Sequence, residues 1–140
     1  QWKIDNARTA LAKEQAASEE FHEGGFIWKT STKKNVSNVA DYILECRVDH
    51  DYPWYCKGEV EIDVIDVNGS AKTGNPMSQF CFTDTHIAMW FENCNYWPYL
   101  IDPKRYCVNG TVTINFRLKI ISSSGCCGSM LPTLDPPDIA

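Results

Sequence analysis

The feature that most constrains the fold is a strict alternation of apolar and polar residues between Val112 and Ile120. Apolar side chains occupy every second position, and Thr, Asn, Arg and Lys fill the positions between them. Because successive side chains of a β-strand point to opposite faces, this stretch predicts a strand with one buried face and one wet face. Such a strand needs neighbours and a covering layer, so we expect a layered, mainly β domain.

Residues 54–67 carry the same alternation, with Val and Ile interleaved with acidic residues. A short turn, HDYP, separates this stretch from another strand-like stretch at residues 41–48, and we expect the two to form a neighbouring pair. The dipeptides Asn68-Gly69 and Asn109-Gly110 tolerate the positive φ angles of tight hairpin turns. These two turns frame the middle of the predicted sheet.

The first 23 residues differ in composition from the residues that follow. They are rich in Ala, Glu, Lys and Gln and contain neither Gly nor Pro, which favours a helix ending at Gly24 and Gly25. Their apolar residues partly follow a heptad, so this segment could be the end of a coiled coil that builds a homo-oligomer. We therefore expect a helical segment over 1–23, a β domain over 24–121 and a flexible, Pro-rich tail over 122–140.

Charge and apolar run length argue against two classes of partner. The net charge is -5, and Lys and Arg are scattered along the chain, so the basic surface that nucleic acids require is missing. The longest apolar runs are far shorter than the roughly 20 residues that cross a bilayer. We expect neither a nucleic-acid partner nor a membrane span.

Several aromatic and cysteine motifs follow one another in a characteristic order. In chain order they are Tyr42-Ile43-Leu44-Glu45-Cys46, Trp54-Tyr55-Cys56, Asn68-Gly69, Phe80-Cys81-Phe82, Trp90-Phe91, Tyr99-Leu100-Ile101-Asp102-Pro103 and Asn109-Gly110-Thr111-Val112-Thr113-Ile114. Over residues 25–121 this order resembles a MATH domain (meprin and TRAF homology). The two cysteine motifs are most similar to those of nematode MATH-domain proteins.

This resemblance implies an antiparallel TRAF-like β-sandwich of about seven or eight strands, here preceded by a helix in place of the usual opening strand. It also implies a protein-binding module, because many relatives are adaptors that present partners to ubiquitin ligases or signalling complexes. Carried over by position, the resemblance places the peptide-binding residues at Ile43, Ile62, Phe80 and Trp90. The alternative at each position is a side chain that simply faces the core.

Other chemical patterns in the sequence are weak. Cys81 and His86 could form a nucleophile and base only if a turn intervened, since strand positions five apart point to opposite faces. The carboxylates of Glu59, Glu61 and Asp63 share one strand face, which is typical of a solvated surface. The sequence has no C-x-x-C pair and no phosphate-binding loop. We expect no enzyme activity, no metal site and no cofactor.

The compartment is open between two alternatives. Cys46 and Cys56 could meet across a short turn, and Asn35, Asn68 and Asn109 begin glycosylation motifs, as in a secreted, disulfide-containing recognition module. The seven cysteines are an odd number, however, and two of these Asn residues are already explained as turn formers. We therefore favour a cytoplasmic protein with free thiols.

A carbohydrate-binding sandwich is the rival binding class. It predicts several coplanar aromatic rings on one exposed face, drawn from Trp28, Trp54, Trp90, Trp97, Tyr96 and Tyr99. A peptide-binding site predicts instead a single exposed Trp beside an open strand.

Overall fold

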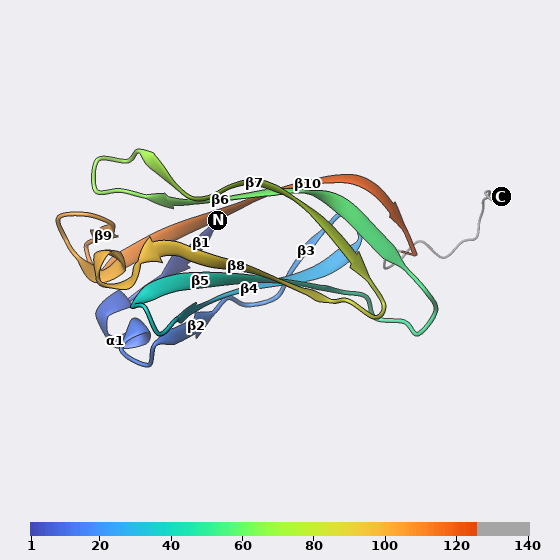
Figure 1. Ribbon diagram of the computed structural model, residues 1–140, viewed down its shortest axis with the longest axis horizontal. Helices are drawn as coiled ribbons and strands as arrows, with labels where there is room; N and C mark the ends of the chain where they lie inside the picture. The colour runs from blue at the N-terminus through green and yellow to red at the C-terminus, as the bar shows by residue number, and fades with distance from the viewer. Residues whose placement is uncertain (126–140) are drawn as a thin grey trace.

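The protein folds as a sandwich of two antiparallel β-sheets (Figure 1). The computed structural model describes residues 1–125. One sheet has the order β1 (Trp2–Ile4), β10 (Thr111–Ser124), β6 (Tyr55–Ile65) and β7 (Ala71–Thr83), and β9 (Cys107–Val108) pairs with β10. The other has the order β2 (Gln15–Ala17), β4 (Phe26–Lys34), β5 (Val39–Arg47) and β8 (Ala88–Tyr96), and β3 (Phe21–Glu23) pairs with β4.

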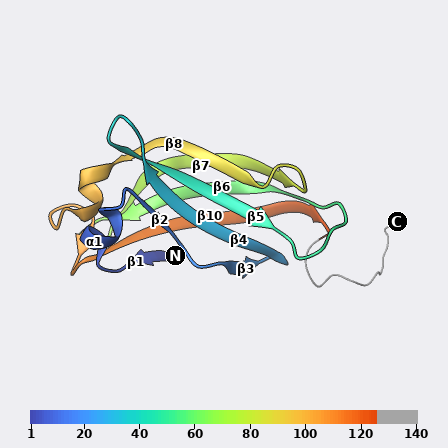
Figure 2. The same ribbon diagram turned by 90° about the horizontal axis from the view of Figure 1, so that it is seen from below.

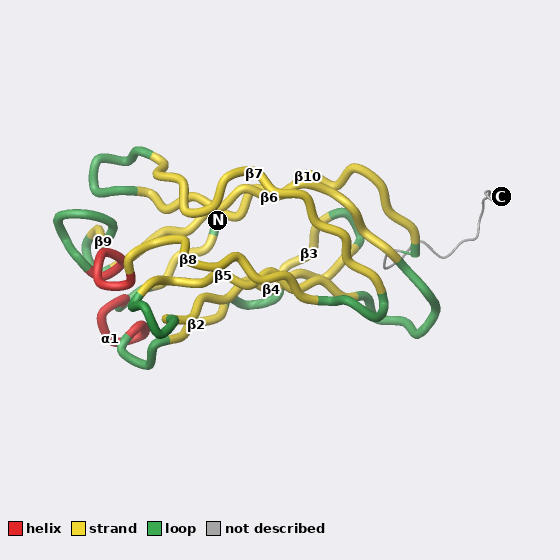
Figure 3. Tube along the Cα trace, in the orientation of Figure 1, coloured by secondary structure: helices red, strands yellow, loops and turns green. Residues whose placement is uncertain are grey.

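Two short helices close one end of the sandwich. They are α1 (Ala7–Leu11) and the 3-10 helix η1 (Trp97–Ile101), and Figure 3 shows both at the same end. Ala7, Leu11 and Leu100 are buried and belong to the same apolar core as the strands. The helices therefore cap the core between the sheets.

The space between the sheets is filled by the apolar side chains that point inward from the strands. The indole of Trp28, on β4, meets Phe80 and Phe82 of β7 edge-on, with ring centroids 5.7 and 5.9 Å apart. Each such aromatic pair adds about 0.5–1.5 kcal/mol to the free energy gained by burial alone. The largest fully buried side chains are Trp28, Tyr42, Phe26, Phe82, Leu11, Leu44, Ile62, Leu100, Ile114, Val60, Val64 and Val112.

The strands at the alternating stretches and the Asn-Gly turns are confirmed, whereas the predicted solvated acidic face is wrong at Asp63, which is buried and pairs with Arg117 at 3.0 Å. The predicted strand at Val112–Ile120 is the main part of β10, which continues to Ser124. Gly69 has a φ of 83° between β6 and β7, and Asn109 and Gly110 have φ angles of 52° and 82° between β9 and β10. The strand extends into the start of the predicted tail, and residues 126–140, with Cys126 and Cys127, lie outside the described residues.

The predicted pairing of residues 41–48 with 54–67 is wrong. These stretches form β5 and β6, which lie in opposite sheets: β5 pairs with β4 and β8, whereas β6 pairs with β10 and β7. Two strands with a buried face can either lie side by side or face each other across a core. Alternation alone does not distinguish these two arrangements.

The predicted helix over residues 1–23, and the coiled coil with it, is also wrong. Only Ala7–Leu11 is helical, between the positive φ angles of Asn6 (49°) and Glu14 (64°), and the rest supplies β1, β2 and β3. Helix propensity is a weak preference that tertiary contacts override. Here Ile4 and Leu11 enter the core, and Trp2 pairs with Ile114 of β10. The opening strand of the sandwich is therefore present.

Residues 15–23 complete the edge of the second sheet. β2 pairs with the second half of β4 and β3 with its first half, so together they form one interrupted edge strand. If β2 and β3 are counted as one strand, each sheet has four strands side by side. The short strand β9 is an additional strand of the first sheet. Within residues 1–125, no helix is long and apolar enough to cross a membrane.

We expect Leu11→Ala to lower the free energy of unfolding by about 3 kcal/mol, because it removes a buried side chain from the core. Thr9→Ala, at an exposed position on the same helix, should change it by less than about 0.5 kcal/mol. Urea denaturation measures both values. An unchanged midpoint for Leu11→Ala would mean that the first residues are not part of the cooperative domain.

Candidate functional site

The four residues predicted to bind a peptide do not share a surface. Ile62 is completely buried and Phe80 is only 4% exposed, and both lie between the sheets. Ile43 and Trp90 instead lie on the outer face of the second sheet, since the flanking residues on β5 and β8 point into the core. The assignment of Ile62 and Phe80 to an exposed groove is therefore wrong.

Ile43 and Trp90 are direct neighbours across β5 and β8. In the same register, Cys46 lies opposite Ile87, just before the start of β8. The N–H of Cys46 donates to the carbonyl of Ile87 at 3.0 Å, so these two opposite residues form a hydrogen-bonded pair. Because such pairs alternate along antiparallel strands, Ile43 and Trp90 form a non-hydrogen-bonded pair, whose Cα atoms are about 4.5 Å apart. Their side chains therefore pack closely on the outer face.

The same alternation sets the direction of the Trp90 backbone. Its N–H and C=O do not bond to Ile43, so they point away from β5. β8 is the last strand of its sheet, and no described strand pairs with its other side. The backbone N–H and C=O of Trp90 thus lie on the unpaired side of β8, in a residue that is 51% exposed.

The other sheet edges are less suited to strand pairing. Pro76 interrupts β7 with a residue that has no N–H, and its pairing with β6 shifts register between Val60 and Asp63. Figure 2 shows β7 and β8 along one margin of the sandwich and the short strands β1 and β3 along the opposite margin. Among the described strands, the segment Ala88–Phe91 of β8 is therefore the most regular open edge.

A polar hollow adjoins Ile43 on the outer face. Ala17, Ser31, Ile43 and Trp90 lie in one row across four strands. The hollow has a volume of about 390 Å³, and its lining residues are Lys13, Gln15, Ala16, Ala17, Ser31, Thr32, Lys33 and Ile43. The row thus leads from an exposed aromatic ring to hydroxyl, amide and ammonium groups.

Buried hydrogen bonds hold β8 against β5. The Tyr42 hydroxyl donates to Asn95 Oδ1 at 2.7 Å, and both residues are buried. Burial raises the pKa of Tyr42 well above its ordinary value, so the phenol stays protonated and remains a donor. This bond fixes the strand that carries Trp90.

A second polar network, which the sequence analysis missed, holds the bulge of β8. Asp41 Oδ1 accepts hydrogen bonds from Asn35 Nδ2 at 3.0 Å and from the N–H of Asn93 at 2.9 Å. Asn35 Nδ2 also donates to Asn93 Oδ1 at 2.7 Å. Nδ2 is the atom that an N-glycan would modify, so a glycan at Asn35 would displace part of this network. Asn68 and Asn109 are exposed and lie in turns.

Five thiols lie within residues 1–125, and two of them form the pair that the sequence analysis brought together. Cys46 and Cys56 do lie near each other, but across the core, where the Cys46 thiol donates to the Cys56 sulfur and lowers the pKa of Cys56. Cys81 is exposed on β7, and His86 follows a turn closed by backbone bonds with Thr83. Among residues 1–125, no hydrogen bond joins Cys81 to His86, and no three His, Cys, Asp or Glu side chains gather as metal ligands.

The aromatic rings do not form a coplanar exposed face. Trp28, Trp54 and Trp97 are buried, which leaves Trp90 as the Trp with the largest exposure among the described residues. Tyr96 and Tyr99 meet edge-on, with an interplanar angle of 81°. A single exposed Trp beside an open strand is the pattern expected of a peptide-binding site.

We expect Tyr42→Phe to lower the free energy of unfolding by about 1–3 kcal/mol, because it leaves the buried Asn95 Oδ1 without its donor. Hydrogen exchange of the β8 amides should accelerate in this variant. Tyr52→Phe, which removes an exposed hydroxyl, is the matched control and should change neither measurement. Equal behaviour of the two variants would show that the Tyr42 hydroxyl does not stabilise β8.

The sequence was also compared with known proteins. No protein-family model matches it, and no curated protein matches it.

Proposed function

We propose that the protein binds an extended peptide segment of a partner protein by strand addition at β8. The observation that carries this proposal is the exposed indole of Trp90 on a regular, open strand edge. An added strand would bond to the outward N–H and C=O of Trp90 and continue the antiparallel sheet. Trp90 and Ile43 would then form the apolar surface that selects a peptide side chain.

The energetic balance favours Trp90 as the main contact. A half-exposed indole has a large apolar area still to be buried, and Trp residues are frequent among those that dominate binding free energy. Its backbone lies in a sheet held by the Tyr42–Asn95 bond, so little ordering is needed on binding. The Lys13 and Lys33 ammonium groups at the hollow would favour a peptide with an acidic residue beyond its apolar one.

The MATH-type resemblance supports the same function. The order of the aromatic and cysteine motifs, together with two antiparallel sheets of four strand positions each, supports a TRAF-like sandwich. On this proposal the protein is a cytoplasmic adaptor that brings its bound partner to a larger assembly, such as a ubiquitin ligase or a signalling complex. Its effect would be proximity rather than a chemical step.

Selection from a phage-displayed library of linear peptides, followed by fluorescence polarisation with a synthetic binder, tests the proposal. We expect Trp90→Ala to weaken binding by about tenfold or more, because the peptide loses its main apolar contact. Tyr52→Ala is the matched control, since Tyr52 is also 51% exposed but lies outside β8. Its affinity should match that of the unmodified protein.

Two results would contradict this assignment. A large drop in melting temperature for Trp90→Ala would mean that the indole supports the fold rather than a ligand. Unchanged affinity in a folded Trp90→Ala variant would place the peptide elsewhere. N-methylation of alternate peptide amides should also abolish binding in one register and spare it in the other, as strand pairing requires.

A further inference from the structure

Two buried cysteines face each other across the core. Cys46 lies on β5 and Cys56 on β6, so they come from different sheets, and residues 48–54 connect the two strands at one end of the sandwich (Figure 1). The two residues are 1% and 0% exposed. The Cys46 thiol donates a hydrogen bond to the Cys56 sulfur, so the two sulfur atoms are in contact. A weak polar contact between two thiols therefore joins the sheets at this point.

The strand registers give the same arrangement independently of that hydrogen bond. Cys46 lies opposite Trp28 of β4, and Cys56 lies opposite Phe82 of β7. The rings of Trp28 and Phe82 meet across the core, with their centroids 5.9 Å apart. Since opposite residues on neighbouring antiparallel strands have their side chains on the same face, the two cysteines face each other beside this pair of rings. The packing of the rings thus holds the two thiols at the same level of the sandwich.

Other β-sandwiches carry a disulfide between their sheets in the same setting. In immunoglobulin domains such a disulfide crosses the core, and a buried Trp packs against it. Trp28 is completely buried and lies directly beside Cys46, so it occupies the corresponding place here. Sulfur atoms that are already in contact need only a small approach to reach the S–S bond length of about 2.05 Å. The core can therefore accept a disulfide at this pair.

Two other cysteines of the described residues have different surroundings. The Cys94 thiol donates to the Phe91 carbonyl at 3.3 Å, and burial raises the pKa of Cys94 to about 11, so this thiol stays protonated. Cys81 is exposed on β7 and is open to reagents in the solvent. Cys46 and Cys56 differ from both, because each has a second thiol as its neighbour in the core.

We propose that Cys46 and Cys56 are a site of reversible oxidation, where a small disulfide such as oxidised glutathione converts the two thiols into a disulfide that links the sheets. The Cys56 thiolate attacks one sulfur of oxidised glutathione, the S–S bond breaks, and one glutathione thiolate leaves. The Cys46 thiol then loses its proton and attacks the Cys56 sulfur, and the second glutathione leaves as a thiolate. The protein loses two hydrogens, and one oxidised glutathione becomes two reduced ones. In a reducing compartment the bond is transient, because free glutathione reverses both steps.

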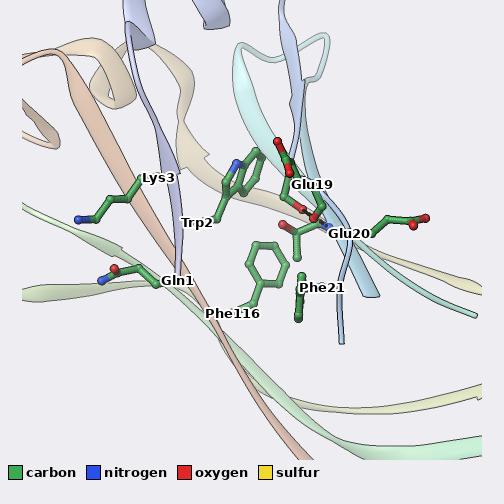
Figure 4. A pocket seen from close by; sticks show the side chains of 9 residues that line it. Gln1, Trp2, Lys3, Glu19, Glu20, Phe21 and Phe116 are labelled. Carbon is green, nitrogen blue, oxygen red and sulfur yellow. Dashed lines mark hydrogen bonds between the residues drawn. The ribbon is translucent and has the colours of Figure 1, made fainter. Parts of the chain in front are cut away.

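The burial of the pair determines when the exchange begins. Both sulfur atoms are shielded from solvent in the folded protein, so the first attack occurs before the sheets close or during a local opening. A cavity of about 370 Å³ does open between β1, β3 and β10, where Trp2, Phe21 and Phe116 gather (Figure 4), but neither cysteine lines it. Once the sheets pack, they hold the two sulfur atoms together. This proximity favours one intramolecular disulfide over two mixed disulfides with glutathione.

Refolding of the full chain from urea in a mixture of reduced and oxidised glutathione tests the proposal. Trypsin cleaves after Lys34, Arg47 and Lys57, so residues 35–47 and 48–57 leave as separate peptides with one cysteine each. Mass spectrometry without reduction should find these two peptides cross-linked, and dithiothreitol should separate them. The melting temperature should rise by about 5 °C or more when the disulfide closes, because the bond restricts the unfolded chain.

Three variants serve as controls. Cys46→Ala should abolish both the cross-linked peptide and the rise in melting temperature. Cys81→Ala, at an exposed position outside the pair, should retain both. Trp90→Ala should also retain both, because the disulfide does not depend on peptide binding at β8.

The peptide map of the unmodified chain is decisive even if Cys46→Ala does not fold. The proposal is overturned if the chain refolds with these two peptides separate, or with Cys56 joined to a cysteine other than Cys46. It is equally overturned if the oxidised protein melts at a lower temperature than the reduced protein, since the bond would then oppose the native packing.

Discussion

The contact of Trp28 with Phe80 and Phe82 is the interaction on which the rest of the structure depends. It joins the two sheets where β4 begins and β7 ends, with one ring from β4 packed edge-on against two rings from β7. Since β7 and β8 form the same margin, this contact also sets how the open edge of β8 lies relative to the first sheet. A second edge-on contact joins the sheets between Tyr42 of β5 and Phe116 of β10, with ring centroids 5.9 Å apart.

The parts of the fold that could be predicted are those governed by local rules. Period-2 alternation predicted β10, and Asn-Gly chemistry predicted two turns, because both depend on neighbouring residues alone. The first 23 residues could not be predicted in the same way. Their helix-favouring composition is outweighed by pairing with β10 and β4, which lie far away in the sequence.

Of the four residues that the resemblance placed in a groove, Ile43 and Trp90 lie on an outer face, whereas Ile62 and Phe80 take the inner face. Which face a residue takes depends on register and bulges, and one bulge shifts β8 against β5 between Ala40 and Tyr42. The network of Asn35, Asp41 and Asn93 left no signal in the sequence, because only the fold brings these three residues together.

The pairing of β1 with β10 has a consequence for how the chain reaches its native state. Trp2 lies opposite Ile114, so the first of the described strands pairs with the last of them. β10 also lies between β1 and β6, and without it neither strand has its neighbour on that side. During synthesis the first sheet therefore stays incomplete until nearly all of the domain has left the ribosome. High contact order of this kind makes folding slow, and it leaves the Trp28 surface exposed to chaperones in the meantime.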